Sequence, residues 1–238
     1  MTFAAVDQFK FPFVVGEWCT LGELRAVTGH LLIGRRSNPP FSAKLRTQRR
    51  TDLPWAKAWN EEFFPLKLLA DHMKLADADS FMWTPDGPAD FTIGLSSGPL
   101  NIQCTMAYPE WPAAAGKPPG QIHYLEMKQY NETGRSYGGG LISEPHAREA
   151  EEDVRAWQAG INSAVLNKLR PKYAGTHLLV YVPRCQFDTI DFSFSDIVGA
   201  AVREVPDWKD VFKGLYILDA PEGAFFEITR EMASNTLP

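Results

Sequence analysis

Apolar residues that recur every three or four positions predict a helix over residues 55–73. Because an interior proline costs about 3 kcal/mol, Pro65 predicts a kink there, or two short helices. A capping-box pattern at Thr20–Glu23 predicts an earlier helix that ends near Gly29. A longer amphipathic helix is predicted over residues 147–172. The apolar stripe of the 55–73 helix consists of Trp55, Trp59, Phe63, Leu66, Leu69 and Met73.

Two alternating apolar and polar runs, 89–95 and 100–106, predict a β-hairpin, since only a short turn-forming segment separates them. We expect Leu95 to face Leu100 across this turn. Further along the chain, the pattern predicts a strand buried on both faces, then a short helix, then two closing strands. These elements are expected at residues 177–182, 195–205, 214–218 and 224–228.

The expected register makes one face of the hairpin polar. Asp90 would lie opposite Thr105, and Thr92 would lie opposite Gln103. Because side chains alternate along a strand, these four residues share one face, while the apolar residues between them form the core face. The polar face predicts either a cluster of functional residues or an ordinary solvent-exposed sheet surface.

The order of these elements predicts an α/β fold with a mixed central β-sheet flanked by helices. Residues 1–53 are expected to form an N-terminal extension, and residues 54–238 an α/β domain, the two making up one compact unit. The segment 107–146 is rich in proline and glycine and predicts no clear element apart from a candidate strand over residues 122–130.

Composition narrows the class of protein. Hydrophobic residues make up 45% of the chain and charged residues 22%, which is typical of a globular domain. The three cysteines are widely spaced, which argues against a disulfide framework or a zinc site. No apolar run approaches the roughly 18 residues of a membrane span, and the N-terminus lacks a secretory pattern. We therefore expect a cytoplasmic protein without a membrane partner.

A basic segment stands out in a chain of net charge −5. No acidic residue lies between Gly34 and Arg50. Such segregation predicts a patch that binds nucleic-acid phosphates, although chance clustering on a solvated loop explains it equally well. The candidate nucleic-acid-binding residues are Arg35, Arg36, Arg46, Arg49 and Arg50.

Three segments together resemble the core of the PD-(D/E)XK, or restriction-endonuclease-like, superfamily. They are the 55–73 helix with Glu61 and Glu62, the sequence Pro88-Ala89-Asp90-Phe91, and the sequence Ile102-Gln103-Cys104-Thr105. The later helix and the apolar strand after it fit the same order, so the resemblance covers roughly residues 55–183. It implies a restriction-endonuclease-like core in which a helix glutamate, a hairpin aspartate and a strand acid gather Mg²⁺, or Mn²⁺.

The resemblance assigns metal-binding and catalytic roles to Glu62, Asp90 and Gln103, with Glu61 as the fallback for Glu62. Thr105 occupies the position of the family's catalytic lysine. The chain departs from the pattern at two positions. An amide in place of a carboxylate brings no charge to a hard cation, and threonine supplies no positive charge to a phosphate. Both departures predict weak metal affinity and slow or absent cleavage.

Two features of the sequence are candidates to compensate for the departures at Gln103 and Thr105. Lys168 on the long helix is a candidate for a lysine that has moved, and Glu126-Met127-Lys128 is a candidate for a displaced ExK motif. The leading hypothesis is thus a divergent Mg²⁺-dependent nuclease that acts on DNA or RNA. The alternative is a catalytically inactive module that binds nucleic acid or protein on the same fold. The resemblance also allows a homodimer, since many members of the family work as dimers.

Overall fold

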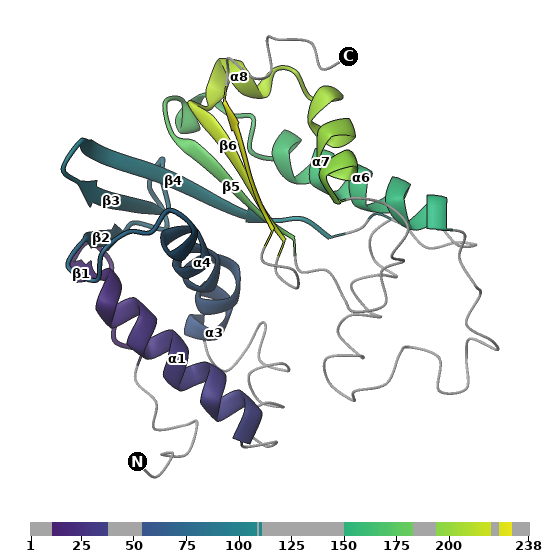
Figure 1. Ribbon diagram of the computed structural model, residues 1–238. Helices are drawn as coiled ribbons and strands as arrows, with labels where there is room; N and C mark the ends of the chain where they lie inside the picture. Colours follow the sequence, from purple (N-terminus) through teal and green to yellow (C-terminus); the bar gives the residue numbers. More distant parts are fainter. Residues whose placement is uncertain are drawn as a thin grey trace.

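The computed structural model describes residues 11–37, 54–108, 110, 150–182, 194–219 and 224–229. Within them, seven strands form one mixed sheet whose order follows the chain (Figure 1). Pairing is antiparallel from β1 to β4, parallel from β4 to β6, and antiparallel again between β6 and β7. The strands are β1 (Trp18–Thr20), β2 (Ser80–Trp83), β3 (Phe91–Leu95), β4 (Gly98–Met106), β5 (His177–Val182), β6 (Gly214–Asp219) and β7 (Phe225–Thr229).

Helices lie on both sides of this sheet, and each side has its own hydrophobic core (Figure 1). Side chains alternate along the strands, so Leu179 and Leu178 of the same strand point into different cores. The predicted fold class, an α/β mixed sheet flanked by helices, is confirmed. One side carries α1 (Leu21–Ser37), α3 (Pro54–Ala58), the π-helical turn η2 (Trp59–Phe63) and α4 (Phe64–His72). The other carries α6 (Ala150–Leu166), the 3₁₀ turn η3 (Pro171–Tyr173), α7 (Phe194–Arg203) and α8 (Trp208–Val211).

The predicted 55–73 helix is present over residues 54–72 as three helical segments that follow one another without interruption, α3, η2 and α4. Pro65 lies in the first turn of α4, directly after the π-helical turn, and has no N–H to donate to that turn. The π-helical turn η2 precedes it and connects α3 to α4. Such turns insert an extra residue into a helix and are frequent at functional sites. Both candidate helix acids, Glu61 and Glu62, lie on this turn.

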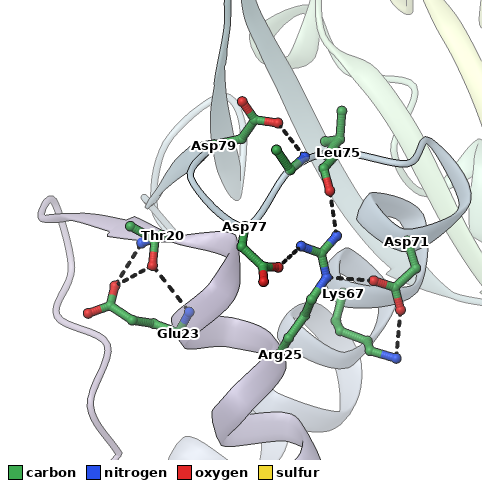
Figure 2. Close-up of polar contacts among 9 residues, drawn as sticks. Thr20, Glu23, Arg25, Lys67, Asp71, Leu75, Asp77 and Asp79 are labelled. Carbon is green, nitrogen blue, oxygen red and sulfur yellow. Dashed lines mark hydrogen bonds and ion pairs between the residues drawn. The ribbon is translucent and has the colours of Figure 1, made fainter.

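The predicted capping box is present at the start of α1 (Figure 2). The Glu23 carboxylate accepts hydrogen bonds from the Thr20 backbone N–H at 2.8 Å and from its hydroxyl at 3.0 Å. Thr20 in turn accepts from the Glu23 N–H at 3.1 Å. The expected end at Gly29 is wrong, since α1 continues to Ser37. Burial of Leu31 in the core outweighs the modest cost of a glycine inside a helix.

Arg25 fastens α1 to α4 and to the loop before β2 (Figure 2). Its Nε lies 2.7 Å from the Asp71 carboxylate, and its other nitrogens donate to Asp77 and, at 2.8 Å, to the Leu75 carbonyl. Lys67 also binds Asp71, at 2.7 Å. These cations hold the pKa of Asp71 below its usual range even though burial opposes them. Strand β1 and helix α1, both from the predicted N-terminal extension, thus join the same sheet and core.

The hairpin forms, but its register differs from the expected one by two residues. Leu95 pairs with Gly98 rather than with Leu100, and Thr92 pairs with Asn101 rather than with Gln103. The turn therefore contains two residues instead of four, because Gly98 adopts a φ of +119° that other residues avoid. A slip of two preserves which side chains share a face.

The later elements follow the prediction with one correction. The predicted strands and helix after residue 176 are present within one residue at their starts. The long helix, however, ends at Leu166 and not near Pro171, which instead begins η3. Lys168 therefore lies in the turn after α6 and not on the helix itself. Strands β1 and β2 are too short for their periodicity to identify them in the sequence.

Candidate functional site

Asp90 lies just before β3 and is 6% exposed. Its Oδ2 accepts a hydrogen bond from the Cys104 backbone N–H at 2.7 Å and another from the Gln103 side-chain amide. Gln103 is itself only 2% exposed. The alternative of a solvent-exposed polar sheet face is therefore wrong for these two residues. The two-residue shift in register accounts for their contact.

The environment of Asp90 sets its protonation. Burial raises the pKa of this carboxyl, and the hydrogen bond from the Cys104 N–H opposes that effect. Lys168 and Lys172 also lower the pKa by electrostatic attraction. Both amines therefore lie within electrostatic reach of the buried carboxylate.

Glu62 extends from the π-helical turn toward the same region. Its Oε2 accepts a hydrogen bond from the Trp83 indole N–H at 2.7 Å. Burial raises its pKa to about 7, and the negative charge of Asp90 contributes to that rise. Glu61, the fallback, lies 3.9 Å from the Lys57 amine, with its side chain 34% exposed. Glu62 thus shares an electrostatic environment with Asp90.

The Gln103 amide is oriented by the hydrogen bonds that its Nε2 group donates. Its Nε2 donates to Asp90 and, at 3.3 Å, to the Cys104 carbonyl. Its Oε1 is buried and has no hydrogen-bond partner within the part of the chain that the structure describes. A buried acceptor without a partner carries a free-energy cost of about 1–3 kcal/mol, so a ligand that satisfied Oε1 would recover that cost.

Lys168 and Lys172 lie near one aromatic ring. Their ammonium groups are 5.3 Å and 4.7 Å from the centroid of Tyr173. Tyr173 is 7% exposed and packs in the core beneath α6 and α7. Of these three residues, only Lys168 is a candidate site residue predicted from the sequence. The alternation of basic residues around Pro171 was the signal that could have identified the others.

Thr105 lies further along β4, where it pairs with Val180 of β5 and is half-buried. Cys104 occupies the core face, as predicted, and is 4% exposed. Burial and the nearby carboxylates raise the pKa of its thiol well above the usual value, which keeps it protonated.

Asp90, in the loop before β3, is thus hydrogen-bonded to Gln103 of β4 and lies within electrostatic reach of Glu62 of η2 and of Lys168 in the turn after α6. No group of three His, Cys, Asp or Glu side chains suited to a metal ion occurs among the described residues. The potential donors are two carboxylates and one amide oxygen, a set with the oxygen chemistry that Mg²⁺ prefers but with one negative charge fewer than the family pattern. The Gln103 amide faces Asp90 with its Nε2 and not its Oε1, so its oxygen would join the two carboxylates around a cation only after the amide had rotated.

The remaining candidates fall outside the described side chains. Arg35 and Arg36 belong to the last turn of α1, but the structure describes only their backbone. Glu126 and Lys128 lie outside the described residues, as do the arginines of the 38–53 segment, Arg46, Arg49 and Arg50. The predicted basic patch and the displaced ExK motif both remain predictions.

Comparison with known proteins adds no assignment: no family model, curated protein or solved structure matches the chain. None of the helices in the described ranges combines the length and the apolar character needed to cross a bilayer. Inference about function therefore rests on the residues around Asp90.

Proposed function

We propose that this protein is a divergent PD-(D/E)XK-type phosphodiester hydrolase that depends on Mg²⁺, or Mn²⁺, and acts on DNA or RNA. The observation that carries the proposal is the association of Asp90 with Glu62, Gln103 and Lys168. These are the residue types that the family resemblance requires, apart from the amide and the relocated lysine. They come from η2, the start of β3, β4 and the turn after α6.

The order of the elements supports the same proposal. A helix precedes an antiparallel hairpin, and a second helix then leads to a strand parallel to β4. This is the order on which the restriction-endonuclease-like resemblance rests. The acidic residues lie at the edge of the hairpin, where the π-helical turn brings Glu62 into the environment of Asp90.

Each residue has a role in the proposal. Glu62 and Asp90 would hold the cation, joined by the Gln103 amide oxygen once the amide had rotated away from its present hydrogen bond to Asp90. The cation's chemistry is to polarise a phosphate and lower the pKa of water. The Cys104 N–H fixes the Asp90 carboxylate. Lys168 supplies a positive charge that stabilises the negative charge developing on the phosphate, the role that Thr105 cannot fill.

A second candidate is a non-catalytic module that binds nucleic acid or protein on the same fold. One observation favours it: the Gln103 amide donates to Asp90 and so stabilises the carboxylate without a cation. In an active member of the family an acidic residue would stand at this position and would repel Asp90 unless a cation lay between them. The two candidates therefore differ in whether the site takes up metal.

The test combines calorimetric titration of Mg²⁺ and Mn²⁺ with cleavage assays on single-stranded DNA, duplex DNA and RNA. We expect weak metal binding and slow cleavage by the wild type, and loss of both in Asp90→Ala with retained circular dichroism. Ser97→Ala, in the hairpin turn, is a matched control outside the site. Cleavage that survives in Asp90→Ala would overturn the site assignment. Nucleic-acid binding without metal uptake or cleavage would favour the non-catalytic module.

A further inference from the structure

A cluster of basic side chains lies where α6 leads into β5. Lys168, Arg170 and Lys172 alternate through the turn and η3, and Lys213 precedes β6. No acidic residue occurs from residue 154 to residue 176, although the chain has a net charge of −5. These four residues are called the basic cluster below.

Two members of the basic cluster lie near the same aromatic ring. The ammonium groups of Lys168 and Lys172 lie 5.3 Å and 4.7 Å from the centroid of the buried Tyr173 ring. Contact with an aromatic face stabilises each cation. Bringing two like charges to one ring costs repulsion, however, and an anion bound between them would remove that cost.

Backbone contacts bring the other two members beside them. The Tyr173 N–H donates to the Arg170 carbonyl at 3.0 Å, which closes the η3 turn. The Lys213 N–H donates to the Thr176 carbonyl at 2.8 Å. A Cβ built on Gly175 would lie 3.9 Å from the Lys213 Cε, so this side chain extends along the same turn.

The cluster forms no ion pair within the part of the chain that the structure describes. Among the ion pairs of the described residues, none includes Lys168, Arg170, Lys172 or Lys213. Asp90 attracts both Lys168 and Lys172, but the hydrogen bonds found for its carboxylate come from Gln103 and the Cys104 backbone. The lysines therefore lie beside the candidate site, with Arg170 and Lys172 exposed to solvent.

We infer that the basic cluster is a phosphate-binding surface that holds the backbone of a nucleic-acid strand next to Asp90. This inference rests on the proposed function and deepens it by stating where the strand lies. It also assigns the interface to residues other than the arginine-rich segment 34–50 predicted from the sequence. Because the contacts are to phosphates, the surface selects for charge and not for base sequence.

The experiment measures binding of a fluorescein-labelled 20-nucleotide single strand and of the matching duplex by fluorescence anisotropy, in EDTA, over a series of salt concentrations. The variants are Lys168→Gln with Lys172→Gln, and Arg170→Gln with Lys213→Gln. Lys74→Asn is the control, since it also removes a lysine charge and asparagine tolerates the φ of 55° found there. Circular dichroism and thermal unfolding confirm that each variant folds.

We expect the wild type to bind both probes with an affinity that falls steeply with salt. Each phosphate contact contributes about 0.9 to the slope of log affinity against log salt for duplex DNA, and about 0.7 for a single strand. Each double variant should therefore lower the duplex slope by about 1.8. The control should leave the slope unchanged. The effect should be the same for probes of different sequence.

Three results would overturn the inference: no binding by the wild type, unchanged slopes in both folded double variants, or binding to anionic vesicles or polyglutamate without binding to either probe. Unchanged slopes together with a loss in Arg46→Gln and Arg49→Gln would place the interface on the predicted basic segment instead. Because EDTA removes metal, the assay is independent of cleavage. Binding that depends on the basic cluster, without cleavage in Mg²⁺, would support this inference and count against the hydrolase.

Discussion

Replacing Gln103 with glutamate would restore the acidic residue that the PD-(D/E)XK pattern places at this position. Without metal the change should destabilise the protein, for two reasons. The amide hydrogen bond to Asp90 is lost, and a second carboxylate is brought against Asp90 at a position where both residues are buried. Like charges in a buried site raise the pKa of one partner and oppose ionisation of both.

The size of this effect follows from the contact that is removed. A hydrogen bond to a charged group contributes about 1.5–3 kcal/mol, so we expect Gln103→Glu to lower the free energy of unfolding by about 3 kcal/mol in EDTA at pH 8. A cation that binds only the folded state restores stability according to its concentration. It contributes about 2.7 kcal/mol at 100 times its dissociation constant.

The assay is urea unfolding, followed by circular dichroism, in EDTA and in increasing Mg²⁺ or Mn²⁺. Gln103→Met is the matched control, because it removes the same donor from Asp90 but adds no charge. Both variants should lose stability in EDTA. Metal should recover most of the loss in Gln103→Glu, little of it in Gln103→Met, and should stabilise the wild type only weakly.

The reasoning would be refuted by a folded Gln103→Glu protein that metal stabilises no more than it stabilises Gln103→Met. That result would mean that the carboxylates do not converge on a common point. A variant as stable as the wild type in EDTA would instead show that the contact between the amide and Asp90 contributes nothing. Either outcome would remove the main support for the proposed metal site.

Two further predictions concern stability. Because the folded-state pKa of Glu62 lies near 7 and its ordinary value is 4.5, ionising it costs stability as pH rises through this window, by up to about 3 kcal/mol. Glu62→Gln should therefore become progressively more stable than the wild type between pH 4.5 and 7 in urea unfolding, and a difference in stability that stays constant over this range would contradict the prediction. Arg25→Met should lower the free energy of unfolding by about 1–2 kcal/mol, because it removes the contacts that fasten α1. Lys67→Met removes only a pair four residues apart and should cost about 0.5 kcal/mol or less; equal losses in the two variants would contradict the fastening role. The pKa of Asp71 is lowered, so its stabilisation is present at neutral pH and lost in acid, where the Arg25→Met difference should narrow.

Local sequence patterns predicted much of the fold. The capping box at Thr20 and the strand at 177–182 follow from interactions within a few residues of one another, and each is present. The hairpin also followed from alternation, but its register did not. The register depended on the conformation of Gly98, and sequence alone leaves a two-residue and a four-residue turn equally open.

Sequence by itself determined which residues share the polar face of the hairpin, because alternation holds whichever of the two turns forms. It did not determine that Asp90 and Gln103 are buried or that they are hydrogen-bonded to each other. Nor did it reveal that the Trp83 indole donates a hydrogen bond to Glu62, or that the ammonium groups of Lys168 and Lys172 both lie near the ring of the buried Tyr173. Trp83 and Glu62 lie 21 positions apart, so only the packing of a helical turn against the sheet brings them together. Asp90 and Gln103 meet because of the register of the hairpin, and Tyr173 is buried because it packs in the core formed with α6 and α7. Tertiary structure decided these features, because each depends on how the elements pair and pack.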